Sequence, residues 1–193
     1  MNLLNFNLDS LVLVLYMMLP LVISGIFHMI VVKKNYFSQF KIAINKSLFG
    51  QNKTYRGFLI MALTTPIGVL VTQQIIQKIY FENYPSLQIK MFADASYEYL
   101  GFFLGLAYCL MELPNSFMKR KLKIPEGKLG MNKYFLVQVI FDQIDSGLGI
   151  ILVYFYFIKI SILEASLFIL LGLFIHLMMN YLLYLLKLRN NPI

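Results

Sequence analysis

The stretch YFLVQVIFDQIDSGLGIILVYFYFI, residues 134–158, is apolar along most of its length but carries Asp142 and Asp145 in its middle. An apolar stretch of this length predicts a membrane-spanning helix. One aspartate at the centre of such a helix costs about 2.5 to 3.5 kcal/mol, so the pair costs about 5 to 7 kcal/mol before compensation. The i, i+3 spacing puts both carboxylates on one helix face. We therefore expect the pair to hold a cation in a polar pocket; the alternative is a structural pair neutralised by a Lys or Arg of a neighbouring helix.

The whole chain is far more apolar than a soluble protein. Of its 193 residues, 59% are hydrophobic and 13% are charged, whereas soluble domains carry about 25% charged residues. This predicts an integral membrane protein, an all-α polytopic helix bundle in which residues 1–193 form one domain. About five spans are expected, at residues 11–32, 57–76, 98–118, 134–158 and 162–186. The single cysteine, Cys109, excludes an internal disulfide and a cysteine-based zinc site. His28 and His176 show no ligand spacing, so we expect packing or interfacial roles for them.

Basic residues fall mainly on one side of these spans. The loops at residues 33–56 and 119–133 and the tail after residue 186 hold six, six and two of the 17 Lys and Arg residues. Because basic loops stay in the cytoplasm, we expect the N-terminus outside, the C-terminus in the cytoplasm, and a protein of the plasma or inner membrane. The net charge of +8 indicates contact with anionic membrane lipids or an anionic substrate such as a nucleotide, and not with nucleic acid.

Residues 50–57, GQNKTYRG, enter the second span with an anion-binding composition. Lys53 and Arg56 supply two cations, Thr54 supplies a hydroxyl, and glycines flank them just before a helix N-terminus. Free backbone N–H groups and the helix dipole favour a phosphate at such a place. The alternative is a basic membrane anchor with a turn. The candidate phosphate ligands are Asn52, Lys53, Thr54, Arg56 and Gly57.

Residues 112–120, ELPNSFMKR, end the third span with polar side chains. A helix end with snorkelling Lys119 and Arg120 would explain the two cations but not Glu112. The spacing i, i+3, i+4 and i+7 places four polar residues on one helix face, namely Glu112, Asn115, Ser116 and Lys119. We therefore expect this face to line a polar site.

The acidic residues of the third and fourth spans lie at similar depths below the cytoplasmic face. Asp142 is nine residues inside Lys133, or about 13 Å, and Glu112 is seven residues inside Lys119, or about 10 Å. If the two helices pack side by side, the acids share one site. Oxygen ligands without Cys or His favour a hard cation, above all Mg²⁺. The candidate metal ligands are Asp142, Asp145, Glu112 and Asn115.

In this order, the three segments resemble the CTP:phosphatidate cytidylyltransferase family, and most closely its short five-span branch, the CDP-archaeol synthases. The family's Lys-Thr-x-x-Gly element matches residues 53–57, and its closing Asp-x-x-Asp-Ser matches residues 142–146. Its acid four residues before a serine, followed by Lys-Arg, matches residues 112–120. The resemblance covers residues 45–150. The chain departs from the family in having Glu112 where aspartate is usual and Asn115 where long-branch members often carry an acid.

The resemblance implies a Mg²⁺-dependent enzyme that forms a CDP-activated lipid and pyrophosphate from CTP and a lipid phosphate. Diacyl phosphatidate and an isoprenoid ether phosphate both remain open as the lipid. The implied metal ligands are Asp142 and Asp145, with Glu112 or Asn115 helping. Lys119 and Arg120 would bind the lipid phosphate or the pyrophosphate, and Ser116 completes the candidate catalytic residues.

Three other functions fit parts of the pattern. A CTP-dependent lipid kinase would use similar residues but transfer the γ-phosphate. A transporter or ion-binding membrane protein would use the intramembrane acids as a coupling site, although the phosphate-type segments and the lack of an inverted repeat argue against it. A catalytically silent relative would keep the fold and serve as a scaffold.

Overall fold

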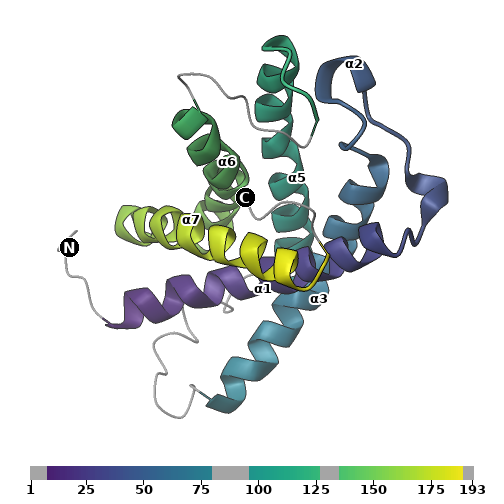
Figure 1. The fold of residues 1–193 in the computed structure, drawn as a ribbon. Helices are drawn as coiled ribbons and strands as arrows, with labels where there is room; N and C mark the ends of the chain where they lie inside the picture. The colour runs from purple at the N-terminus through teal and green to yellow at the C-terminus, as the bar shows by residue number, and fades with distance from the viewer. Residues whose placement is uncertain (1–7, 80–95, 127–134, 189–193) are drawn as a thin grey trace.

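The computed structural model describes residues 8–79, 96–126 and 135–188, which form long helices (Figure 1). Their bounds are α1 (Leu8–Lys33), α3 (Tyr55–Ile79), α5 (Tyr97–Lys121), α6 (Phe135–Ile158) and α7 (Ile162–Leu185), with a 3₁₀ turn η1 (Ser38–Phe40) and a short α2 (Lys46–Phe49) between α1 and α3. Within these ranges, α1, α3, α5 and α7 are long and apolar enough to cross a membrane. In α6, the described stretch Ile144–Ile158 is also apolar but shorter. The predicted all-α membrane bundle is confirmed.

Helix α5 packs between two other helices. It contacts α3 on one side and α6 on another, while α1 packs on α3, and α7 packs on α1 and α6. Glycines let the backbones approach closely, since a Cβ added to Gly105 of α5 would lie 2.3 Å from the carbonyl oxygen of Met61 in α3. A Cβ added to Gly149 of α6 would lie 2.9 Å from the carbonyl oxygen of Ala107 in α5. Such small residues are the usual means of helix association in a membrane.

The contact between α5 and α6 is antiparallel and sets the position of the polar residues. Because Ala107 lies against Gly149, residues further along α5 meet residues earlier in α6. About two turns beyond Ala107, Asn115 therefore meets Asp142 and Asp145. Close packing at Gly149 thus brings two of the predicted polar segments together.

The apolar core anchors α6 beyond its acidic residues. Tyr154 of α6 is 1% exposed and donates its hydroxyl hydrogen to the backbone oxygen of Met17 in α1 at 2.6 Å. Its ring meets that of Phe168 in α7 edge-on. The second half of α6 is therefore fixed to both α1 and α7.

The segment between α1 and α3 is held against the start of α3. Ala43 and Thr54 form an isolated antiparallel bridge, and the N–H of Ile44 donates to the carbonyl of Lys53 at 2.9 Å. Asn45 caps α2 by accepting two backbone N–H groups of that helix. The loop therefore presents Lys53 and Thr54 at a defined place before α3. Of the other predicted cytoplasmic loop, 119–133, residues 127–133 lie outside the described residues.

Candidate active site

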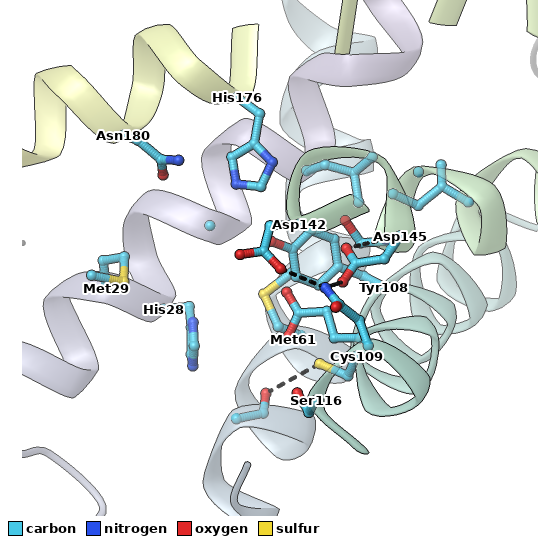
Figure 2. Close-up of a pocket in the computed structure, with 18 of the residues that line it drawn as sticks. His28, Met29, Met61, Tyr108, Cys109, Ser116, Asp142, Asp145, His176 and Asn180 are labelled. Atoms are coloured by element: carbon cyan, nitrogen blue, oxygen red, sulfur yellow. Dashed lines mark hydrogen bonds between the residues drawn. The ribbon is translucent and has the colours of Figure 1, made fainter. Parts of the chain in front are cut away.

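Two carboxylates of α6 converge on one side chain of α5. The amide nitrogen of Asn115 donates to Asp142 Oδ1 at 2.6 Å and to Asp145 Oδ2 at 2.8 Å (Figure 2). Asp145 is 9% exposed, and its other oxygen accepts the backbone N–H of Ser146 at 2.6 Å. The i, i+3 spacing thus places both acids on the face of α6 that packs on α5.

Lys119 lies one turn beyond Asn115 on α5 and forms an ion pair with Asp142. The pair offsets part of the cost of a charge at membrane depth, as a purely structural role would require. Asp145, however, is held by the neutral donors of Asn115 and Ser146. Two carboxylates and one ammonium leave the cluster with a negative charge, so it can attract a cation.

Glu112 contacts the loop before α3. It forms an ion pair with Lys53, and both side chains are about three-quarters buried. Burial by itself lowers the pKa of Lys53, but the Glu112 carboxylate outweighs this effect and holds that pKa above its usual value. Lys53 therefore stays a cation across neutral pH. The pair joins the predicted segments 50–57 and 112–120.

One cavity of about 510 Å³ collects most of the predicted site residues. Its walls come from α1, α3, α5, α6, α7 and the loop before α3. Arg120 also lines this cavity, and its Nε is buried without a hydrogen-bond partner within the described ranges. The predicted residues on the walls are Asn52, Lys53, Thr54, Gly57, Glu112, Asn115, Ser116, Lys119, Arg120, Asp142 and Asp145.

Arg56, also a predicted phosphate ligand, lies elsewhere. It is 3% exposed and is not part of the cavity wall. Its Nη1 donates to the side-chain oxygen of Asn35 and to the carbonyl of Tyr36, both at 3.1 Å. Arg56 therefore fastens the turn after α1 to the start of α3, and the structure does not bring it to the other site residues.

Several polar residues on the cavity wall have no counterpart in the predicted site. His28 of α1 and His176 and Asn180 of α7 line the cavity, and in Figure 2 His28 and Asn180 lie across the view from Asp145, while His176 lies above Asp142. Tyr108 of α5 also lines it. The histidines thus have a place at the site as well as in packing. The i, i+4 spacing of His176 and Asn180 on the strongly apolar helix α7 is a signal that sequence reasoning could have used.

Glu126, just after α5, is another lining residue that the patterns do not indicate. Its Oε1 accepts the backbone N–H of Gln51 at 2.8 Å. The same carboxylate lies against Gly50, which has a φ of +89° and where an added Cβ would lie 2.9 Å from Oε1. Glycine is suited to such a left-handed conformation. Glu126 therefore holds the loop that carries Lys53.

The acid pair suits a hard cation that is only partly ligated by the protein. Among the residues that the structure describes, no group of three or more His, Cys, Asp or Glu side chains could hold a metal ion. Oxygens of Asp142 and Asp145 nevertheless converge on the point where the Asn115 amide nitrogen lies. Mg²⁺ commonly takes one or two carboxylates and fills its other positions with phosphate oxygens and water. The donors present therefore fit Mg²⁺ that arrives with a phosphate ligand.

The chain is similar to known proteins over most of its length. Residues 7–193 match the model of a family described as CarS-like, CDP-archaeol synthase. A CDP-archaeol synthase of Saccharolobus islandicus (strain L.S.2.15 / Lassen #1) is 30% identical over 153 residues, which cover 76% of this chain and 74% of that protein. A CDP-archaeol synthase of Pyrococcus furiosus is 34% identical over 98 residues, which cover 49% of this chain and 52% of that protein. No solved structure matches the chain.

Proposed function

The chain belongs to the CarS-like CDP-archaeol synthase family, and from this membership we propose how its cavity transfers CMP from CTP to an archaeal lipid phosphate and releases pyrophosphate. The activity is that of a lipid-phosphate cytidylyltransferase. The observation that carries the proposal is the convergence of Asp142, Asp145 and Lys119 in a cavity that also contains Lys53. A cation site beside fixed positive charges is what transfer of a phosphorylated group requires.

The lipid phosphate is the nucleophile in this reaction. A phosphate monoester has a second pKa of about 6, so it is mostly dianionic at neutral pH and needs no protein base. One of its oxygens forms a bond to the α-phosphorus of CTP, and the bond from that phosphorus to the pyrophosphate oxygen breaks. The protein therefore contributes positioning and charge neutralisation.

Cationic side chains from two parts of the cavity wall bind different phosphate groups of the substrates. Lys119 and Arg120, which both line the cavity, bind the lipid phosphate or the leaving pyrophosphate. Lys53 meets the nucleotide phosphates, with Asn52 and Thr54 beside it on the wall. The two groups lie on α5 and before α3, so they can hold different phosphates in a fixed relation.

The family typically uses a divalent metal, and we assign Mg²⁺ to the acid pair. Asp142 and Asp145 would hold it, and Asn115 would join them by presenting its amide oxygen in place of its nitrogen. When bound, the ion neutralises phosphate charge during the transfer. Glu112 is engaged by Lys53, so in this proposal it positions that lysine and is not a metal ligand.

The protein is an integral membrane protein with several candidate spans, and we place its cavity at the cytoplasmic face of a single membrane domain. The basic loops at residues 33–56 and 119–133 support this orientation. Their positive charge also raises the local concentration of both anionic substrates. The same loops contact anionic membrane lipids.

Comparing CTP labelled at the α-phosphate with CTP labelled at the γ-phosphate tests the reaction directly. Purified protein with Mg²⁺ and an isoprenoid ether phosphate is expected to move label from α-labelled CTP into the lipid and to release pyrophosphate. Label from γ-labelled CTP should stay out of the lipid; its appearance there would mean a lipid kinase. A folded protein that moves neither label, with the ether phosphate or with diacyl phosphatidate, would have to be a scaffold or a transporter.

Replacing Glu126 with Ala is expected to raise the KM for CTP about fivefold, because the loop before α3 loses a hydrogen bond worth about 1 kcal/mol. The KM for the lipid phosphate should change little. Glu126→Gln is the matched control, since its amide oxygen can still accept the N–H of Gln51, and it should retain most of the affinity for CTP. Equal losses in the two variants, or an equal rise in the KM for the lipid, would contradict a loop-positioning role.

A further inference from the structure

The cavity extends beyond the acid pair into a region between α1 and α7 whose lining is mostly apolar, with His28, His176 and Asn180 as its polar members. Its lining residues there recur at helical spacing, so one face of each helix is turned to the cavity. Members of this region are Met18, Val22 and Gly25 on α1 and Gly172, Ile175 and Met179 on α7. The apolar region and the polar site are therefore parts of one continuous cavity.

The two helices touch at one end of this region and leave space at the other. A Cβ added to Gly172 would lie 3.6 Å from Met18 Cε. Gly25 lies about two turns, or roughly 10 Å, further along α1. Apart from the adjoining backbone of α1 and the two neighbouring residues, a Cβ added there would have no heavy atom of the described residues within 4 Å. The apolar region is thus open beside Gly25.

Gly25 differs from the glycines that pack helices together. Each of Gly68, Gly105 and Gly149 faces atoms of another helix so closely that an added Cβ would clash. Glycine in a helix interior costs about 1 kcal/mol relative to Ala. Close helix packing explains why the three packed positions are glycine, but it does not explain Gly25. This difference points to a ligand as the occupant of the space.

We propose that the space beside Gly25 receives the first part of the lipid substrate's hydrocarbon chain and gives room to the methyl branches of an isoprenoid chain. The inference rests on the proposed function, because a lipid whose phosphate lies at the acid pair must continue into the same cavity. A methyl-branched chain is wider than a linear one, so a side chain at position 25 would meet the branches first. Met18 and Met179 are flexible enough to adapt to the rest of the chain.

Gly25→Leu tests this assignment with two ether lipid phosphates of equal chain length, one methyl-branched and one linear, at saturating CTP. The KM for the branched lipid is expected to rise about tenfold, equivalent to about 1.4 kcal/mol. The KM for the linear lipid should rise less, and the KM for CTP should not change. Gly25→Ala adds one methyl group to open space and should give a smaller rise of the same kind.

Leu15→Phe is the matched control, because Leu15 lies on the same helix but is 44% exposed and does not line the cavity. It should leave all three KM values unchanged. Equal KM changes for the two lipids in folded Gly25→Leu protein, including no change in either, would overturn the proposal, as would an equal rise in the KM for CTP. If Gly25→Leu fails to fold, Gly25→Ala decides by the same comparison. Failure of the wild-type protein to transfer α-label would instead reject the proposed function.

Discussion

Replacing Asp145 with Asn is expected to reduce cytidylyl transfer about a thousandfold, equivalent to about 4 kcal/mol of transition-state stabilisation. The amide keeps the shape of the side chain and can still accept the N–H of Ser146. It removes one of the two negative charges that we propose attract a metal ion. Folding should not suffer, because a neutral amide costs less than a carboxylate at membrane depth.

Two measurements check this expectation in purified protein. Transfer of α-label from CTP reports turnover, and binding of Mn²⁺ followed by electron paramagnetic resonance reports the metal site without catalysis. Glu164→Gln is the matched control, because Glu164 is 3% exposed and forms a capping box with Ser161 at the start of α7. Since Gln also serves at that capping position, this variant should turn over normally.

Turnover within a few-fold of wild type in Asp145→Asn would remove Asp145 from the metal site. Unchanged affinity for Mn²⁺ would do the same, even if turnover fell. Loss of turnover with weaker Mn²⁺ binding and an unchanged unfolding temperature is the result that supports the assignment. The three readouts together separate a metal ligand from a residue that only stabilises the bundle.

The convergence of the polar side chains of α5 and α6 could be predicted, because it depends on residue spacing along these two helices. Asn115 and Lys119 share a face of α5, and Asp142 and Asp145 share a face of α6. Once the two helices pack antiparallel, these faces meet, as the hydrogen bonds of Asn115 and the ion pair of Lys119 show. Helical periodicity alone is therefore enough to predict this part of the site.

Directions of side chains in the loops could not be predicted in the same way. Arg56 belongs to the phosphate-type segment by sequence, yet it turns to Asn35 and Tyr36 after α1. Glu126 joins the loop before α3 across a large distance in sequence. Such contacts depend on how the loops pack against the helices, and no local sequence periodicity specifies that packing.

The far wall of the cavity was missed because it depends on the packing of the first helix against the last. His28 and His176 are isolated polar residues within apolar helices, a pattern that suits a packed or an interfacial histidine as well as a site residue. His28 lies beside Gly57 at the start of α3, and both histidines line the cavity only because helices far apart in the sequence pack together. The sequence therefore predicts one wall of the cavity and leaves the other to tertiary structure.

Replacing Lys53 with Met is expected to lower kcat/KM for CTP about a hundredfold, the typical effect of losing one preorganised electrostatic contact to a reacting group. The variant should also unfold at a lower temperature, because Glu112 would keep a charge that is about three-quarters buried without its partner. Lys121→Met is the matched control. Lys121 ends the same helix as Glu112 but is exposed and does not line the cavity, so it should behave like wild type in both measurements.

The double variant Lys53→Met/Glu112→Gln separates the two roles of this lysine. Removing both charges avoids the unpaired carboxylate, so the unfolding temperature should return most of the way to that of wild type. Activity should stay low, because the nucleotide phosphates still lack their cation. If activity instead returned to within a few-fold of wild type, Lys53 would serve only to neutralise Glu112, and Lys119 and Arg120 would have to hold all the phosphates from the α5 side of the cavity.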